Sequence, residues 1–457
     1  MASSLAHSAA PVLAPALTTS SAFQFLREMR GDLLGCLDRW AEQGGVARFQ
    51  SRLFVSHLVT APAAVQHVLQ DNPKNYVKEV RSARIFAILL GNGLFLSEGE
   101  VWRAQRRVAQ PAFHKQHLAS MAATMTDAVR AMIERWEPCA RSGEPLDLSA
   151  ETMKFALDVV GRCLVHNDLV SDADAFARLM LDTFDYIMYS LNHLLVPPRF
   201  IPTARNRRLR HGMREMDRIV GRVIEHGKVR GGNGGDLLSM LLAAYDPPVG
   251  GSPAQLKTLR DNLATYLGAG TETTAVALSW IWYLLSAHPD AQRKLFDEVD
   301  SVLNGALPTF DDLPRLPYTK MVIDETLRLY PPAFVVSRTA IADDEVGGFR
   351  IPAKSGVFLS SWTTHRSRLY WENPDKFDPE RFSPERSRDR HNYAYYPFGG
   401  GPRMCIGDRF SIMEQTLALA MVAQKFRVQV VNDHPIRPDP VFTLRPSGGI
   451  RATLAKR

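Results

Sequence analysis

A long apolar run at residues 263–287, LATYLGAGTETTAVALSWIWYLLSA, is the feature that most constrains the fold of this chain. As a helix it is long enough to cross a bilayer. Its centre, however, contains Glu272 flanked by Thr271, Thr273 and Thr274, and a carboxylate at the centre of a membrane helix costs roughly 3 kcal/mol. A helix buried in the core of a large protein explains this pattern better. We therefore predict a fold built around one long internal helix, without a membrane span.

Length and composition describe a large folded protein. The chain has 457 residues, of which 45% are hydrophobic and 23% charged, and this excludes a disordered chain or a disulfide scaffold. At roughly 150 residues per domain the length suggests three domains, but no shift in composition marks a boundary. Residues 1–20, rich in Ala, Ser and Pro, lack a basic start and predict a disordered tail rather than a signal peptide.

The charged residues and the cysteines suggest where the protein acts. Lys and Arg total 55 against 48 Asp and Glu, a formal net charge of +7, which fits either an acidic partner or an ordinary solvated surface. The four cysteines are far apart in the sequence, so CxxC metal sites are excluded and a reducing, cytoplasmic location is expected. We expect no nucleic-acid partner.

Hydrophobic periodicity predicts a mostly helical chain without internal repeats. The short strand-like runs are 47–54, 58–60, 338–341, 349–351, 356–360 and 426–431. Residues 231–235 and 195–204 are predicted connections, because they are rich in glycine and proline respectively. The predicted helices are 22–43, 99–110, 117–138, 149–165, 174–193, 206–227, 253–287, 289–304, 318–330 and 408–424.

The segment 398–410, FGGGPRMCIGDRF, points to function. Its three consecutive glycines allow a tight turn and a close approach of the backbone to a bound group. Cys405 precedes a predicted helix, and a helix N-terminus favours the thiolate form of cysteine. Taken alone, a glycine-rich turn that contains a buried thiol would explain the segment equally well.

This segment resembles the haem-binding loop of the cytochrome P-450 family, Phe-x-x-Gly-x-Arg-x-Cys-x-Gly, and every specified position is filled. The resemblance implies that Cys405 is the axial thiolate ligand of haem iron. It also implies that Phe398 packs near the sulfur, that Arg403 binds a haem propionate, and that Gly407 belongs to the cofactor loop. Thiolate ligation pushes electron density onto iron and favours cleavage of the O–O bond.

Two further segments match the family's haem-binding and bracing motifs. Glu325 and Arg328, on one face of an apolar helix, would join Arg381 in a buried charge network that braces the haem loop, a structural role. The i, i+3 spacing is weak evidence by itself, because Glu100/Arg103 has it too. Residues 102–106, WRAQR, resemble the family's haem-anchoring Trp-x-x-x-Arg, so Trp102, Arg106 and, further along, Arg338 are predicted to hold the cofactor.

The segment 269–274, AGTETT, resembles the family motif at which dioxygen is activated. By that resemblance, Ala269 and Gly270 lie beside the cofactor, and Glu272 and Thr273 relay protons as the catalytic pair. The alternative is that the threonine hydroxyls bond back to carbonyls of their own helix, with Glu272 paired elsewhere.

The resemblance spans the chain from about residue 40 and implies a mainly α fold with a small β region, in one catalytic domain at 21–457. It implies a monooxygenase that uses haem b, dioxygen and NAD(P)H-derived electrons. We expect a monomeric, bacterial-type enzyme without a membrane anchor, supplied by a separate acidic ferredoxin or flavodoxin and its reductase. A peroxide-driven peroxygenase or isomerase, which usually lacks the acid–threonine pair, and a non-catalytic haem sensor or carrier are the alternatives.

Family alignment predicts an apolar substrate pocket, lined in part by a loop around 84–96. A fatty acid, a terpenoid and another secondary metabolite would each fit such a pocket. The predicted lining residues are Phe86, Leu89, Leu90, Phe95, Tyr266, Val335, Val336 and Phe442.

Overall fold

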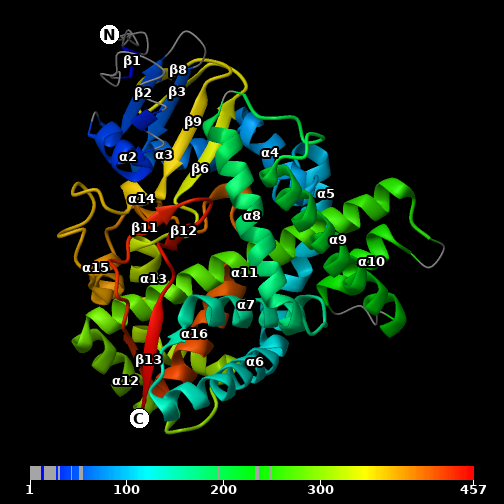
Figure 1. The fold of residues 1–457 in the computed structure, drawn as a ribbon. Coiled ribbons are helices and arrows are strands. Elements are labelled where there is room, and N and C mark those ends of the chain that lie inside the picture. Colours follow the sequence, from blue (N-terminus) through cyan, green and yellow to red (C-terminus); the bar gives the residue numbers. More distant parts are fainter. Residues whose placement is uncertain are drawn as a thin grey trace, which may run out of the picture. The chain divides into compact units, whose positions relative to one another are not determined.

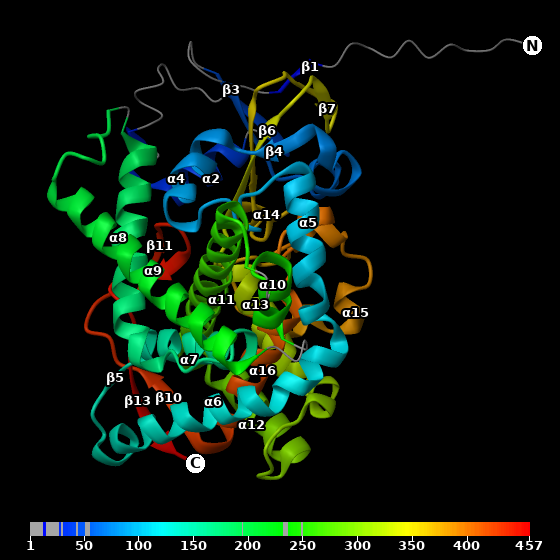
Figure 2. The same cartoon turned by 90° about the vertical axis from the view of Figure 1, so that its right-hand side faces the viewer.

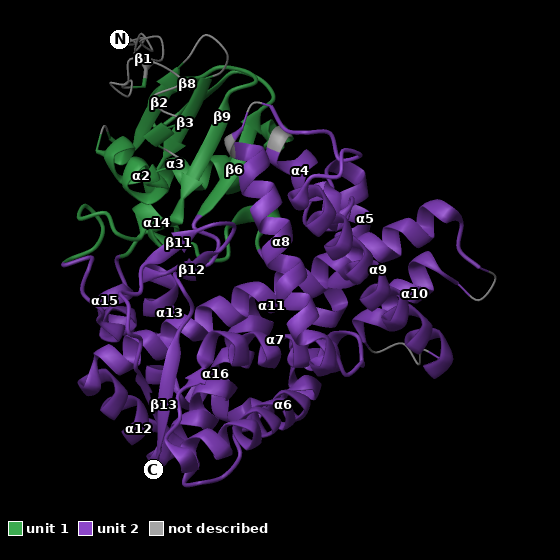
Figure 3. Ribbon diagram, viewed as in Figure 1, with its two compact units in different colours: residues 1–80, 335–372, 390–404 green, residues 81–334, 373–389, 405–457 purple. Residues whose placement is uncertain are grey.

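The computed structural model describes residues 12–14, 27–28, 31–42, 44–50, 55–193, 195–231, 236–247 and 250–457. The chain divides into two compact units (Figure 3): unit 1 comprises residues 1–80, 335–372 and 390–404, and unit 2 comprises residues 81–334, 373–389 and 405–457. Apart from 12–14, the predicted tail at 1–20 lies outside the described residues, as do residues 232–235 of the predicted glycine-rich connection.

Unit 1 is built on a five-stranded sheet with the strand order β2-β3-β9-β6-β4. Figure 1 shows its strands in blue and in yellow, because they come from two distant parts of the chain. A second sheet has the order β1-β8-β7. The strands of unit 1 are β1 (Val12–Leu13), β2 (Val46–Gln50), β3 (Val55–Val59), β4 (Tyr76–Lys78), β6 (Val335–Ala340), β7 (Asp344–Val346), β8 (Phe349–Ile351) and β9 (Gly356–Ser360).

The core of unit 1 contains β-branched and aromatic side chains of these strands and of the short helices beside them. Val59, Val357 and Leu359 are fully buried there, together with Val65 of a neighbouring helix. Such residues favour strands because they pack well on a pleated surface. The helices are α2 (Leu33–Ala41), α3 (Pro62–Gln66) and α14 (Ser361–Thr364).

Unit 2 is mainly helical, and its centre is α11 (Pro253–Ala287). In Figure 2 this helix runs through the middle of the other helices. It packs against α7, α9, α10, α12, α13 and α16. Its remaining helices are α4 (Val80–Leu90), α5 (Gly99–Ala109), α6 (Lys115–Ser142), α7 (Leu148–Leu164), α8 (Ala173–Asn192), α9 (Ala204–Arg230), α10 (Leu237–Tyr245), α12 (Pro289–Leu303), α13 (Pro317–Leu329), α15 (Pro384–Ser387) and α16 (Asp408–Lys425).

The ends of α11 follow from the sequence. The Ser252 hydroxyl accepts a hydrogen bond from the backbone of Gln255, whose side chain bonds back to Ser252, and Pro253 occupies the first turn. This capping box satisfies the free N–H groups of the helix start. The next helix begins at Pro289, directly after the C-cap residue His288. Within the described chain, no helix is long and apolar enough to cross a membrane.

Two small sheets complete unit 2. One has the order β10-β13-β5, and the other is the hairpin β11-β12. In the first, β13 lies between two strands that are about 280 residues apart in the sequence, with Val428 opposite Leu454 and Leu146 opposite Ala452. The strands are β5 (Leu146–Asp147), β10 (Phe426–Val430), β11 (Pro438–Pro440), β12 (Leu444–Pro446) and β13 (Arg451–Lys456).

The predicted fold class, mainly α with a small β region, is confirmed. The helices predicted from 99–110 onward are all present, although their ends differ by a few residues. The prediction of a loop around 84–96 is wrong for residues 84–90, since these belong to helix α4 (Val80–Leu90). Its apolar residues Ile85, Phe86, Leu89 and Leu90 recur at helical spacing. The strands β1, β4, β5, β7, β11 and β12 were not predicted, because runs of two or three residues carry little periodicity. The six-residue strand β13 was also missed.

The predicted structural network lies within unit 2, on α13 and on the short helical turn Pro379–Phe382. Glu325 accepts bonds from Nε and Nη2 of Arg328 at 2.6 and 2.8 Å. It also accepts a bond from Nε of Arg381 at 3.3 Å and one from the backbone N–H of Asp378 at 2.9 Å. The Glu325 and Arg328 side chains are fully buried and that of Arg381 nearly so. One carboxylate thus pairs with two buried guanidinium groups.

Glu325→Ala should lower the free energy of unfolding by about 3–5 kcal/mol, because it leaves two buried guanidinium groups without their shared carboxylate. Urea unfolding of the full chain measures the change. Glu100→Ala is the matched control, since Glu100 also pairs with an arginine at i+3 but its side chain is 85% exposed; it should cost no more than about 1 kcal/mol. Equal losses in the two variants would contradict the network's role.

Candidate functional site

The glycine-rich segment forms a tight turn that only glycine permits. Gly399 and Gly401 have positive φ angles of 72° and 63°. A Cβ atom on Gly401 would lie 1.9 Å from the carbonyl oxygen of Leu69, also in unit 1. The turn is followed by a single helical turn at Gly401–Arg403 and then, after Cys405, by α16, which begins at Asp408.

Cys405 is exposed, whereas Cys36 and Cys163 are buried. Although the residue is accessible, desolvation by the surrounding chain raises the pKa of its thiol to about 11, while the backbone N–H of Gly407 and the charge of Arg106 act in the opposite direction. Coordination to a metal removes the thiol proton outright. An accessible sulfur at the start of a helix, on a turn fixed by glycines, suits a metal ligand.

Arg106 lies on α5 close enough to Cys405 and Asp408 for their charges to affect it. Desolvation lowers the pKa of its guanidinium, and the charges of Cys405, Tyr266 and Asp408 act in the opposite direction. Trp102, one helical turn earlier, is half-buried. A half-buried guanidinium of lowered pKa suits the carboxylate of an anionic ligand.

Three accessible residues interrupt the buried length of α11. Between Asp261 and Trp282, every residue is buried except Ala269, Gly270 and Thr273. Their spacing of i, i+1 and i+4 places them on one side of the helix. A Cβ atom on Gly270 would lie 2.9 Å from Cγ2 of Val160 in α7, so glycine is needed there for packing. The interruption leaves a strip of small side chains open to a flat ligand.

The two predicted catalytic residues differ in their surroundings. The Thr273 hydroxyl, on the accessible side, donates to the carbonyl oxygen of Ala269 at 2.8 Å. Glu272 is fully buried, and its Oε1 accepts bonds from Nε of Arg445 at 2.6 Å and from the Thr443 hydroxyl at 2.7 Å. Both features correspond to the alternative stated above, a back-bonded threonine and a glutamate paired elsewhere. The proton relay remains a prediction.

Arg445 and Thr443 were not singled out in the sequence, because no local pattern connects them to Glu272, which lies 173 and 171 positions away. The only signal was Glu272 itself, since a buried carboxylate requires a cationic or hydrogen-bonding partner. Arg445 also lies over the ring of Phe184, with its Cζ 5.2 Å from the ring centroid.

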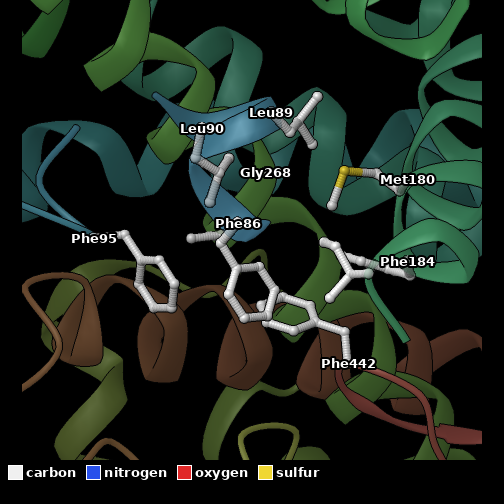
Figure 4. Close-up of a pocket in the computed structure, with 10 residues that line it drawn as sticks. Phe86, Leu89, Leu90, Phe95, Met180, Phe184, Gly268 and Phe442 are labelled. Atoms are coloured by element: carbon white, nitrogen blue, oxygen red, sulfur yellow. The ribbon is translucent and has the colours of Figure 1, made fainter. Parts of the chain in front are cut away.

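An apolar pocket adjoins the accessible side of α11 (Figure 4). Phe442 lies beside Phe86 and Phe184, with its ring centroid 4.9 Å from that of Phe86 and 4.6 Å from that of Phe184. Five of the eight residues predicted to line a substrate pocket line this one, and α8 contributes three residues that were not predicted. The lining is Phe86, Leu89, Leu90, Phe95, Met180, Phe184, Ile187, Gly268, Ala269 and Phe442.

The other predicted residues lie elsewhere. Tyr266 is buried and is not part of the pocket lining. Val335 and Val336 are on β6 in unit 1, as is Arg338, whose Nη1 donates to the carbonyl of Ser337 at 2.9 Å. Within the same unit, Phe398 and Arg403 are half-buried in the glycine-rich turn.

Glu414 is a buried acid that the sequence analysis did not consider. It lies on α16, fully buried, beside the Thr274 hydroxyl, which in turn lies 3.3 Å from the Ser411 hydroxyl. Desolvation raises the pKa of this carboxyl well above its ordinary value, with Thr274 acting in the opposite direction. The carboxyl therefore stays protonated to a higher pH than a solvated glutamate.

Comparison with known proteins agrees with this geometry. The Cytochrome P450 family profile matches residues 40–451. Cyclooctatin synthase from Streptomyces melanosporofaciens is 38% identical, over 78% of this chain and 77% of its own. Pentalenene oxygenase from Streptomyces avermitilis is 33% identical over 81% of both chains. The crystal structure of the cytochrome P450DA heme domain is 26% identical, covers 98% of both chains and superposes with a TM-score of 0.87.

These findings define an oxidoreductase of the monooxygenase class. The chain belongs to the cytochrome P450 family, as its motifs predicted. The family implies a haem cofactor and dioxygen. The residues described here fit such a group, because unit 2 offers an accessible thiol at Cys405, a strip of small residues on α11, and a half-buried cation at Arg106.

Glu414→Gln should make stability less dependent on pH. Because the folded state raises the pKa of Glu414, its stabilising contribution is greatest below about pH 4, where an unfolded glutamate is also protonated, and it falls as the pH rises through the folded-state pKa. A neutral amide does not titrate, so between pH 4 and pH 8 the free energy of unfolding of the variant should rise relative to that of the wild type. Urea unfolding across this range measures the difference. Exposed Glu144 provides the control variant, Glu144→Gln; parallel wild-type and Glu414→Gln curves would contradict a buried, protonated acid.

Proposed function

We propose that this cytochrome P450 inserts one oxygen atom from dioxygen into an apolar terpenoid. The reaction consumes two electrons and two protons, and it releases water with the oxygenated product. Ala269 carries the proposal, because it lines the apolar pocket and its carbonyl accepts the hydrogen bond of Thr273. A substrate in that pocket would thus lie within one helical turn of the predicted oxygen-activating residue.

The composition of the pocket favours a neutral hydrocarbon. Every described residue of the lining is apolar, so nothing there would neutralise the carboxylate of a fatty acid. Apolar pockets gain most from ligands of the same character. The names of the two Streptomyces relatives refer to terpenoids, which supports this substrate class over the others considered.

The proposed roles of the cofactor-binding residues follow from their chemistry. Cys405 would be the axial ligand, and Arg106, Trp102, Arg403 and Arg338 would hold the propionates. Haem, when bound, supplies the redox chemistry that activates dioxygen. The chain's own contribution is to hold the ligand sulfur on a glycine-fixed turn and to keep the substrate side of α11 apolar.

Thr273 and Glu272 would deliver the two protons that the reaction consumes. The Thr273 hydroxyl has a donor hydrogen and two lone pairs, so it can pass on a proton after giving up its bond to Ala269. Glu272 has one oxygen engaged by Arg445 and Thr443, while its Oε2 is buried without a hydrogen bond from the described residues. That second oxygen is the one available to a proton relay.

Electrons would come from NAD(P)H through an acidic ferredoxin or flavodoxin and its reductase. Arg103 and Arg107 on α5 and Arg409 at the start of α16 are exposed. The charges of Cys405 and Asp408 affect the pKa of Arg106, which indicates that α5 lies beside the start of α16. Opposite charges would speed the encounter of the two proteins, and salt would slow it.

The main alternative reactions differ in what they consume. A peroxygenase or isomerase would turn over without reductant, and a haem sensor or carrier would form no product. Product that requires both a reduced partner and dioxygen would distinguish the proposed reaction from all of them.

Terpene hydrocarbons should shift the visible haem spectrum of the purified enzyme, because they displace water from the cofactor, whereas fatty acids of similar size should bind more weakly. Phe442→Ser should weaken terpene binding by about tenfold or more, since burial of a phenylalanine side chain is worth roughly 1.5–3 kcal/mol. Exposed Leu369 provides the control variant, Leu369→Ser. A panel in which only fatty acids shift the spectrum would refute the substrate class.

Cys405→Ala should abolish the thiolate-type spectrum, either by loss of haem or by loss of the strongly red-shifted band of the reduced carbon monoxide complex. The buried Cys163 provides the control, and Cys163→Ala should keep that band. Circular dichroism shows whether the fold is retained. Persistence of the band in Cys405→Ala would refute the ligand assignment.

Thr273→Ala should keep haem and substrate binding but divert electrons to hydrogen peroxide, because protons are no longer delivered in order. We expect product per electron to fall by about tenfold or more. Thr273→Ser should restore much of it, and Thr271→Ala, on the buried side of the same helix, should leave it unchanged. The ratio of product formed to NAD(P)H consumed is the measurement. If this ratio in Thr273→Ala equals that of the wild type, the hydroxyl has only a structural role.

A further inference from the structure

Part of the wall of the apolar pocket is a segment that secondary structure does not hold in place. Of residues 89–96 (the wall segment), Leu89, Leu90 and Phe95 line the pocket, and Figure 4 shows their side chains around it. Helix α4 ends at Leu90, and residues 91–96, all of them described, belong to neither a helix nor a strand. Other contacts must therefore fix the backbone of this segment.

Two consecutive side chains of α11 accept hydrogen bonds from that backbone. Asp261 Oδ2 accepts from the N–H of Asn92 at 2.8 Å, and Asn262 Oδ1 accepts from the N–H of Leu94 at 3.1 Å. Both acceptor side chains are buried. The carbonyl of Asn92 accepts a further bond, at 2.9 Å, from Nε2 of Gln105 in α5. Because hydrogen bonds are stronger where water is excluded, these bonds hold the wall segment to its two neighbouring helices.

The end of α4 is bound by the preceding residue of α11. Nη1 of Arg260 donates to the carbonyl oxygen of Leu89 at 2.7 Å. This carbonyl lies in the last turn of α4, where carbonyls lack partners within the helix and form the negative end of its dipole. A guanidinium group is therefore a favourable cap. Residues 260–262, which we call the anchor triplet, thus bind the wall segment at positions 89, 92 and 94.

Two glycines allow the wall segment to approach α11 this closely. A Cβ atom on Gly91 would lie 2.0 Å from Cγ of Asp261, and one on Gly93 would lie 2.4 Å from the backbone oxygen of Asp261. Gly91 also has a φ angle of 58°, in the left-handed region that favours glycine. A side chain at either position would push the segment away from α11, so the sequence of the segment is fitted to this contact.

The anchor triplet lies behind the pocket wall. None of its residues belongs to the described lining of the pocket. Asp261 pairs with Lys257 at 2.5 Å and with Arg260 at 3.4 Å, and Arg260 also pairs with Asp217 of α9 at 2.7 Å. Such pairing offsets the cost of burying a carboxylate. A ligand in the pocket would therefore meet only the apolar side chains that the triplet holds in place.

From these contacts we propose that the anchor triplet positions the wall segment and thereby determines which sizes of apolar substrate the pocket accepts. Leu89 is itself bonded to the triplet, and Leu90 and Phe95 are each next to a bonded residue. A backbone held at three points cannot move away as the ligand becomes larger, so the pocket should discriminate by size. This inference rests on the proposed function, because it takes the apolar pocket to be the substrate pocket.

Spectral titration of the haem-loaded full chain tests the proposal. Monoterpene, sesquiterpene and diterpene hydrocarbons give three Kd values, and the ratio of the largest to the smallest measures size discrimination. Asp261→Ala should lower this ratio by about tenfold, because it removes a charged hydrogen-bond acceptor from the wall segment. Asp261→Asn keeps an oxygen acceptor for the N–H of Asn92 and should restore most of the ratio. Asn262→Ala, which removes one neutral acceptor, should change the ratio in the same direction and provides the test if Asp261→Ala does not fold.

A matched control separates size discrimination from stability. Asp324 on α13 is also largely buried and is also paired with a lysine four residues earlier, but α13 contributes nothing to the described pocket lining. Asp324→Ala should lower the free energy of unfolding and leave the ratio of Kd values unchanged. Amide hydrogen exchange of the ligand-free protein gives a second readout. Exchange at Asn92 and Leu94 should be faster in Asp261→Ala than in the wild type.

The proposal is overturned if Asp261→Ala and Asn262→Ala both keep the wild-type ratio, or if Asp324→Ala lowers it equally. Unchanged exchange at Asn92 and Leu94 in Asp261→Ala would also overturn it, because the bonds would then not hold the segment. A wild type that binds no terpene would refute the proposed substrate class instead. In that case fatty acids of increasing chain length replace the terpenes in the titration, and the same comparison of variants tests the anchor triplet.

Discussion

Burial of a polar centre in α11 is the constraint on which unit 2 depends. A helix surrounded by other helices must be apolar on every side, yet Glu272 is fully buried in its middle. The cost of burying that carboxylate is offset by Arg445 and Thr443, so the β11–β12 hairpin is held to the central helix. One turn of the same helix, with Ala269, Gly270 and Thr273, is left uncovered. The apolar pocket begins there.

The two halves of the predicted acid–threonine pair are thus attached to different parts of the protein. Thr273 belongs to the accessible strip, whereas Glu272 is bound to the β11–β12 hairpin, whose turn supplies Phe442 to the pocket. Arg445 also lies over Phe184, another lining residue. Packing in the pocket and the hydrogen bonds of Glu272 therefore share one short segment of chain, residues 442–445.

Local patterns could be predicted from the sequence, and contacts between distant segments could not. The extent of α11 was predicted at 253–287 from its hydrophobic periodicity, and the Cys405 loop from its glycines. The network of Glu325 with Arg328 and Arg381 was also predicted, but only because a family motif connects Arg381 to the other two residues. Arg445, Phe184 and Glu414 were missed, since nothing near them in the sequence marks a partner on α11. Helix α4 was missed although its spacing is helical, because its residues were assigned to a pocket loop.

The C-terminal strand has a consequence for synthesis of the protein. β13 lies between β10 and β5, and β5 at Leu146–Asp147 is made long before it. A ribosome emits the chain from its N-terminus, so β13 emerges only after about 300 residues that follow β5. The sheet edge at residue 146 must wait, unpaired, throughout that interval, and such an edge is a template for association with other chains. A nascent chain of this protein therefore keeps an open sheet edge, and with it a site of aggregation, until β13 has been made.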